Sequence, residues 1–369
     1  MKKSLQKVFQ IVLNLALGAG IALCILPWAL ANFADDPLLL FEAKIFLGFI
    51  PAFVCYMVMI IAHEAGHLLA GLQSGYAFVS FRVLSLTLIR LDGRLQWKRY
   101  SLAGTGGQCL MKPPAWTEKG IPVQLYNWGG VMVNASLLIL TVPLLFLVPL
   151  DSIGGMMLCM IAVMNAYGVI ANGIPMMNND ADNALHLTKD MTAQRAFWAQ
   201  MTGHALLVKG VALRDIPGDL YALPDDADLT NPLIATSAAN QAQLPMYHHR
   251  FDEADKAMAD VLERAGEGLH PINRFMLVNE RIWYELMHEN RAEVLSAFED
   301  KQFRQYQKAM KNYPGVIRVV YTKALANHDS SAVAKLREQL KKVSKTYPYQ
   351  QEIGEEWALV AMADEHFSH

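Results

Sequence analysis

Two histidines and a glutamate in the first third of the chain have the spacing of a metal site. Residues 63–67 read His-Glu-Ala-Gly-His, inside an apolar run that is expected to be helical. Residues four apart share a helix face, so His63 and His67 can turn ring nitrogens toward one metal ion. Glu64 is not needed as a ligand, and its carboxylate can take a proton from a water molecule beside the metal. Chance produces this pattern in roughly one or two unrelated chains in a hundred, so its setting matters.

The composition indicates a membrane part followed by a soluble part. Of the 369 residues, 53% are hydrophobic and only 18% are charged, whereas ordinary soluble domains carry about 25% charged residues. The apolar excess lies in the first half of the chain. The net charge of −2 gives no support for a nucleic-acid partner. The cysteines lack CxxC spacing and are expected to serve packing: Cys24, Cys55, Cys109 and Cys159.

Four apolar runs are long enough to span a lipid bilayer, at about residues 8–31, 44–71, 125–150 and 153–175. The first could instead be a signal peptide cleaved after residues 29–31. Its apolar core is longer than the usual one, which favours an uncleaved transmembrane helix. The second run puts His63 roughly 28 Å of helix beyond Lys44, close to the far side of a hydrocarbon core about 30 Å thick. Ionisable groups at that depth are costly, which favours a functional role for them.

Residues 76–112 change character and predict a β-hairpin near the membrane face. Alternating runs at 86–91 and 94–100 flank Asp92-Gly93, a strong hairpin signal. A glycine-rich piece at 104–107 would let the backbone approach another group closely. The edge of this hairpin could bind an extended peptide by strand addition. It could equally be a structural cap on the helical bundle.

A third metal ligand is expected just after the fourth span. Two histidines leave a catalytic zinc one protein ligand short, and a carboxylate is a frequent third. Pro175 disfavours helix just before it, which places Asp180 on a loop at the membrane face. Asp180 is therefore the predicted ligand, with Asp182 as the alternative. A simpler role also fits, because Asn179, Asp180 or Asp182 could cap a helix beginning near residue 184.

The distribution of basic residues predicts that both termini are cytosolic. The chain starts with three lysines, and the loop from about residue 74 to 124 is rich in Lys and Arg. The links at 32–43 and 149–152 carry only acidic charges. By the positive-inside rule the N-terminus and the loop at 74–124 face the cytosol. With four spans, the C-terminus then lies on the same side. His63 and Asp180 then lie on the same cytosolic side of the membrane.

From about residue 190 the chain is charged and helical in pattern. Residues 190–229 read as a helix and a linker, and 230–369 as a cytosolic helical domain. Residues 247–257 resemble the turn between helices of a tetratricopeptide-type repeat, in which Phe251 and Ala254 would pack. The spacing is irregular, so helix pairs are predicted rather than a counted repeat. Further helical segments are expected near 272–300, 303–328 and 331–346.

Taken together, these motifs resemble the site-2 protease family of intramembrane zinc metallopeptidases. Residues 63–67 match its HExGH helix, and Asn172-x-x-Pro175-x-x-x-x-Asp180 is similar to its second motif. Gly130-x-x-x-Asn134 is similar to its Gly-Pro-x-x-Asn element. The resemblance covers about residues 43–185. It departs from the family at Val131, where Pro is common, and at Ala181, where Gly is usual.

The resemblance implies hydrolysis of a peptide bond in or beside the membrane, in a membrane protein or peptide substrate. One zinc ion held by His63, His67 and Asp180 would lower the pKa of a water molecule. Glu64 would take the proton and later pass it to the leaving amine. Asn134 or Asn172 would donate to the developing oxyanion or support the site.

The expected fold is mainly α: a four-span bundle (residues 1–189) with a small β-hairpin and a C-terminal helical-repeat-like domain. That domain could select substrates or bind a cytosolic protein partner. Three other function classes stay open. The chain could be an inactive metallopeptidase-like module that binds or regulates, or a zinc-dependent hydrolase of a non-peptide substrate. A transporter is disfavoured, because the spans show no inverted repeat and the ionisable groups gather at one face.

Overall fold

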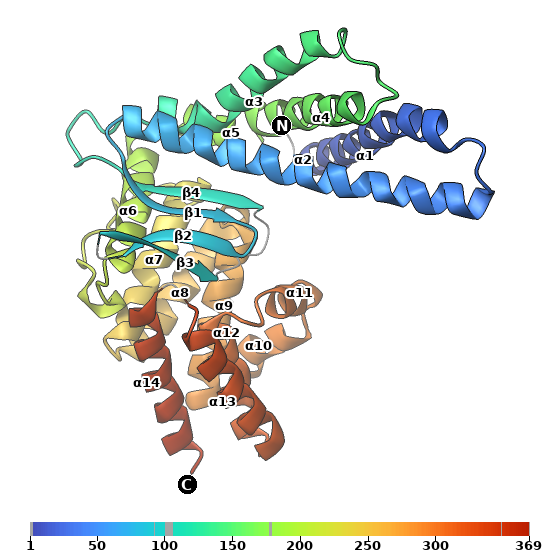
Figure 1. Ribbon diagram of the computed structural model, residues 1–369. Helices are drawn as coiled ribbons and strands as arrows, with labels where there is room; N and C mark the ends of the chain where they lie inside the picture. The colour runs from blue at the N-terminus through green and yellow to red at the C-terminus, as the bar shows by residue number, and fades with distance from the viewer. Residues whose placement is uncertain (1–2, 92, 100–105, 177–178, 348, 369) are drawn as a thin grey trace. The chain divides into compact units, whose positions relative to one another are not determined.

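The computed structural model describes residues 3–91, 93–99, 106–176, 179–347 and 349–368 (Figure 1). The described chain is mainly helical, with one small sheet. It forms two compact units. The first unit holds residues 1–78, 106–109 and 122–189, and the second holds residues 79–105, 110–121 and 190–369.

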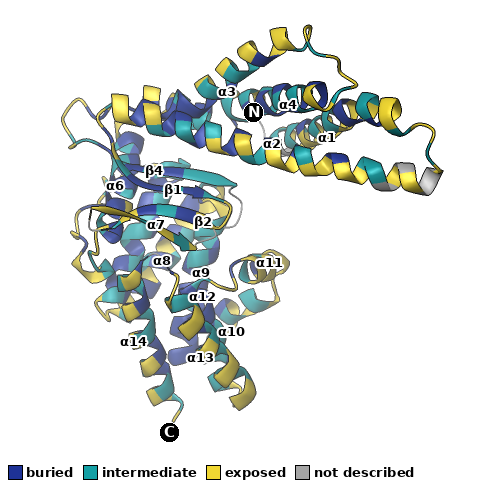
Figure 2. Ribbon diagram, in the orientation of Figure 1, coloured by how far each residue is buried: buried dark blue, intermediate teal, exposed yellow. Residues whose placement is uncertain are grey.

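Four long helices make up most of the first unit, together with the short α5 (Asp180–Leu187). They are α1 (Lys3–Phe33), α2 (Leu38–Gln73), α3 (Gln124–Leu144) and α4 (Ile153–Gly173). Each is long and apolar enough to cross a membrane. Large hydrophobic side chains on them are exposed, including Phe46, Ile50 and Ile139, and Figure 2 shows such exposed residues along α2. An apolar outer surface of this kind suits contact with lipid.

The third span is shorter than the sequence predicts. Helix α3 ends at Leu144 rather than near residue 150, and the chain continues in tight turns. The N–H of Phe146 donates to the carbonyl of Pro143, and the N–H of Leu147 donates to the carbonyl of Leu144. Pro149 disfavours helical backbone at residue 148, so the helix would not be expected to continue through residue 150.

Helices α2 and α3 approach so closely that their backbones touch. A Cβ added to Gly66 would lie 2.3 Å from the carbonyl oxygen of Gly129. A Cβ added to Gly129 would lie 2.5 Å from the carbonyl oxygen of Gly66. Small residues permit this kind of close packing between apolar helices. As a result the face of α2 that carries the two histidines lies directly against α3.

The sheet has four strands rather than the predicted two. They are β1 (Ala77–Val83), β2 (Leu86–Leu91), β3 (Arg94–Arg99) and β4 (Gly107–Lys112), in the order β3-β2-β1-β4. The expected hairpin is present, since β2 and β3 pair antiparallel from Leu91 and Arg94 to Leu86 and Arg99. Gly93 in its turn has a φ of 75°, which glycine adopts without strain. Asp92, and residues 104–105 of the glycine-rich piece, lie outside the described residues.

Most of the sheet belongs to the second unit, although the sequence grouped residues 76–112 with the spans. Ile89 on β2 is fully buried in a core that also contains Ala199, Leu244 and Ile353. The last three residues come from α6 (Met191–Val208), α7 (Pro232–Tyr247) and α14 (Gln350–His366). Burial of apolar side chains therefore ties this part of the sheet to the C-terminal helices.

The second unit is otherwise helical, and neighbouring helices pack in pairs such as α7 with α8 and α12 with α13. The predicted helix–turn–helix segment at 247–257 contains the end of α7, residues 248–250 and the start of α8. Ala254 is fully buried there, and the Phe251 ring lies 5.2 Å from the Trp283 ring. The helices are α6 (Met191–Val208), α7 (Pro232–Tyr247), α8 (Phe251–Ala265), α9 (Pro271–Met287), α10 (Ala292–Leu295), α11 (Lys301–Ala309), α12 (Pro314–Ala326), α13 (Ser330–Ser344) and α14 (Gln350–His366).

Several predicted boundaries in this unit are wrong. The segment expected near 303–328 is two helices, because Pro314 lacks an N–H and begins α12. The segment near 272–300 is α9 followed by the short α10, and α14 was not predicted. The predicted linker packs against the unit, with Tyr221 and Leu229 buried.

Candidate metal centre

Three side chains from two helices of the first unit converge on one point. His63 and His67 lie on α2, and Asp180 is the first residue of α5. The Nε2 atoms of the two histidines are 3.2 Å apart. The Oδ2 atom of Asp180 lies 3.1 Å from Nε2 of His63 and 3.2 Å from Nε2 of His67. These three residues form a group with the geometry to hold a metal ion.

The other ring nitrogen of each histidine faces an oxygen. Nδ1 of His63 lies 2.6 Å from Oδ1 of Asn134, and Nδ1 of His67 lies 2.8 Å from the carbonyl oxygen of Tyr126. Both oxygens accept hydrogen bonds, so each Nδ1 carries the proton and each Nε2 presents a lone pair. Two nitrogen lone pairs and a carboxylate oxygen then meet within about 3 Å. Such a group repels itself unless a cation, either a metal ion or a proton, lies between its members.

A chain of amides determines which way Asn134 faces. Its Nδ2 donates to Oδ1 of Asn165 at 2.9 Å, and Nδ2 of Asn165 donates to the carbonyl of Ile161 at 2.8 Å. A carbonyl can only accept, so it orients Asn165, which in turn orients Asn134 with its oxygen toward His63. Both Asn134 and Asn165 are buried. Of the two roles predicted for Asn134, these contacts favour support of the histidine over donation to an oxyanion.

Gly130 explains how the ring of His63 fits between the helices. A Cβ at Gly130 would lie 2.4 Å from Cε1 of His63. Any side chain on this position of α3 would therefore displace the ring. The glycine that opens the Gly130-x-x-x-Asn134 element makes room for the histidine, and the asparagine that closes it orients the same histidine.

Asp180 lies in the first turn of a helix, and not on the loop that the sequence predicts. Asn179 is the N-cap of α5, and its Oδ1 accepts from the N–H of Asp182 at 3.0 Å. Its Nδ2 donates to the carbonyls of Ala171 and Ile174 at the end of α4. Asn179 thus serves as the cap, and Asp180 is left to join the histidines.

The alternative ligand and the second asparagine lie away from this group. Oδ1 of Asp182 is 3.4 Å from Nδ1 of His186, one turn further along α5. Asp182 is not among the residues whose ligand atoms converge. Asn172 is the penultimate residue of α4, and its side chain forms no hydrogen bond to another described residue. Neither residue belongs to the group that converges among the described residues.

The electrostatics keep the Asp180 carboxyl ionised. Burial raises its pKa, but when a proton is the cation between these groups, hydrogen bonds and positive charge from the His63 and His67 rings outweigh this and hold the pKa at about 2. The group is therefore a carboxylate at neutral pH. An ionised ligand is what a cation requires, because a protonated carboxyl would compete with the metal.

Glu64 lies between the histidines on α2 and against strand β4. It is 9% exposed and interacts electrostatically with both histidines and with Asp180. A Cβ at Gly107 would lie 2.6 Å from Oε1 of Glu64, and the backbone N–H of Cys109 donates to the carboxylate. The backbone of β4 therefore passes directly beside this carboxylate.

Tyr126 connects the strand to the histidines. Its hydroxyl donates to the carbonyl of Cys109 at 2.8 Å, and its own carbonyl faces His67. Its ring stacks on the ring of Tyr76, with centroids 4.9 Å apart and planes 5° from parallel. Sequence reasoning missed this residue, as it missed Asn165. Each is a polar side chain within a mainly apolar helix, and that was the available signal.

The amide chain predicts a measurable effect on metal affinity. Asn134→Ala should weaken metal binding by roughly 10–100-fold, because the Nδ1 proton of His63 loses the partner that orients the ring. Titration of the purified protein against a competing chelator measures the effect. Asn127→Ala is the matched control, since Asn127 lies on the same helix and, among the described residues, its side chain hydrogen-bonds only to the carbonyl of Val123. Equal affinities for the two variants would show that Asn134 does not support His63.

Comparison of the chain with known proteins finds no matching family model, no similar curated protein and no similar solved structure. The geometry of this site is therefore the basis for assigning a function.

Proposed function

We propose that the protein is an intramembrane zinc metalloprotease that cleaves a membrane-embedded or membrane-proximal peptide bond. The observation that carries this proposal is the convergence of two imidazole lone pairs and one carboxylate beside a second carboxylate. The three converging groups would hold the metal, and Glu64 would be the catalytic residue. The resemblance of the motifs at residues 63–67, 130–134 and 172–180 to the site-2 protease family supports the same assignment.

The ligand set suits zinc. Zn²⁺ binds histidine nitrogen and carboxylate oxygen, and catalytic sites commonly use three protein ligands with one position open. When bound, zinc supplies a Lewis acid that lowers the pKa of a water molecule and polarises a carbonyl. Glu64 would take a proton from a water molecule at this site and pass it to the leaving amine. The low exposure of Glu64, His63 and His67 limits the entry of other water.

Strand β4 is the better candidate for a substrate clamp. The sequence pointed to the edge of the 86–100 hairpin, but the outer strand of that hairpin is β3, at the opposite edge of the sheet from β4. Strand β4 is itself an edge strand, and its residue Gly107 lies against Glu64. A substrate helix that unwinds can add an extended segment to such an edge, which brings its carbonyls near the carboxylate.

The proposed setting is a cell membrane, crossed four times by α1 to α4. The basic loop at 74–124 and the acidic links at 32–43 and 149–152 support cytosolic termini. In this orientation the substrate is a membrane protein or peptide, and residues 230–369 face cytosolic partners.

A metal measurement tests the proposal. Protein purified in detergent without added chelator should hold about one zinc ion per chain, and His67→Ala should lose it. His186→Ala is the control, because His186 is half exposed and pairs with Asp182 instead of the metal group. If the folded wild-type chain neither holds zinc nor takes it up on titration, the metalloprotease assignment is wrong.

A further inference from the structure

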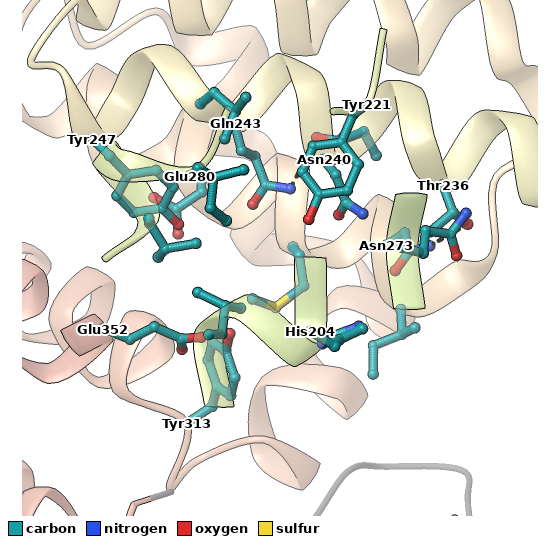
Figure 3. A pocket seen from close by; sticks show the side chains of 18 of the residues that line it. His204, Tyr221, Thr236, Asn240, Gln243, Tyr247, Asn273, Glu280, Tyr313 and Glu352 are labelled. Carbon is teal, nitrogen blue, oxygen red and sulfur yellow. Dashed lines mark hydrogen bonds between the residues drawn. The ribbon is translucent and has the colours of Figure 1, made fainter. Parts of the chain in front are cut away.

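The second unit contains a cavity of about 260 Å³ that shares no residue with the metal centre (Figure 3). Helices α6, α7, α9 and α14 supply most of its lining, and Met310 and Tyr313 close one side. The cavity is too small for a folded partner and suits one long side chain.

The lining carries more acidic than basic side chains. Among the described residues that line the cavity, three are glutamates and none is Lys or Arg. Arg318, almost fully buried behind the lining, lies 2.6 Å from Glu280 and 2.7 Å from Glu356. One guanidinium therefore serves two carboxylates. The pKa of His204, the other basic group at the cavity, is lowered by desolvation.

Glu352 has no cationic partner among the described residues. Its carboxylate accepts a hydrogen bond from the hydroxyl of Tyr347 at 2.8 Å, which is a neutral donor. Burial raises the pKa of Glu352 to about 7, against the effect of that hydrogen bond. Charge burial of this kind is unfavourable, and a cation entering the cavity would relieve it.

Polar groups on α7 face the same space without partners. The side chains of Asn240 and Tyr247 form no hydrogen bonds to other described residues, and Figure 3 shows Asn240 with Gln243 and Tyr221 around the cavity. An asparagine amide offers one donor and one acceptor group, the same pair that a peptide bond needs. Apolar residues complete the wall, among them Ile216, Ile272 and Met276. Such a wall suits the methylene stem of a long basic side chain.

We propose that this cavity binds an extended segment of another protein by taking in one lysine or arginine side chain. The ammonium or guanidinium group lies beside Glu352, and Asn240 pairs with the backbone of the segment. The binding is independent of peptide hydrolysis at the metal centre, so it stands or falls separately from the proposed function.

Fluorescence anisotropy with the full-length protein in detergent tests this proposal. The probes are labelled, acetylated heptapeptide pools, randomised except for a central Lys, Arg, Gln or Glu. The Lys and Arg pools should bind at least about tenfold more tightly than the Gln and Glu pools, because hydrogen bonds to charged groups are the strong ones. Glu352→Gln should remove most of that preference. It keeps an acceptor for Tyr347, so the variant is expected to fold.

Two further variants make the result specific. Glu365→Gln makes the same charge change at an exposed position of the same helix and should leave binding unchanged. Asn240→Ala should weaken all pools severalfold, since it removes a backbone contact. Equal affinity for the Lys and Gln pools, or equal effects of the two glutamate changes, would overturn the proposal. If free spermidine displaced the labelled Lys pool as effectively as the unlabelled Lys pool does, the cavity would bind a cation without needing a peptide. That result would overturn the claim that the cavity binds a protein segment.

Discussion

The Glu64→Gln protein should keep its zinc and lose peptide-bond cleavage by about 10²–10⁴-fold. Glutamine has nearly the shape of glutamate, and its amide oxygen can still accept the hydrogen bond from the N–H of Cys109. What it lacks is the ability to take a proton from water and to return it to the leaving amine. The change therefore separates metal binding from the proton transfers of peptide hydrolysis.

The measurement compares cells that produce the wild-type chain with cells that produce Glu64→Gln. Mass spectrometry of the membrane fraction counts new peptide termini, and elemental analysis of the purified proteins counts zinc. Glu42→Gln is the matched control, because Glu42 is an exposed residue of the same helix. New termini that depend on Glu64 but not on Glu42 support a protease. Identical termini for wild type and Glu64→Gln would instead favour a protein that binds substrates without cutting them.

Asp180→Asn should weaken zinc binding by more than about 100-fold, while Asp182→Asn should leave it almost unchanged. Removing a residue that orients a ligand weakens metal affinity by about 10–100-fold, and removing the ligand itself should weaken it more. The two aspartates stand in the same turn of α5, but only the Asp180 carboxylate lies 3.1 and 3.2 Å from the two histidine nitrogens. Asp182 lies beside His186.

This pair of variants also controls for the fold, because both remove one negative charge from the first turn of the same helix. Any effect of that charge on the helix dipole is shared by both. Zinc affinity measured by chelator competition therefore reports the ligand alone. Loss with Asp182→Asn and retention with Asp180→Asn would move the third ligand two residues along the chain.

The sequence by itself determined the features that depend on local periodicity. Four apolar runs of membrane length were visible in it, and so was the shared helix face of His63 and His67. The shared face follows from 3.6 residues per helical turn. The apolar runs follow from the cost of placing unpaired polar groups in a bilayer. The hairpin at 86–99 followed from its turn residues in the same way.

Only the tertiary structure decided which distant groups meet. The cap on α5 could have been Asn179, Asp180 or Asp182, and the hydrogen bonds of Asn179 to the end of α4 left Asp180 for the histidines. Two further results depend on contacts between helices: the amide chain through Asn165 and the fit of the His63 ring against Gly130. The order of the sheet strands, and the glutamates gathered around one cavity, likewise come from segments far apart in the chain. Periodicity acts within one element, whereas each of these depends on how separate elements pack.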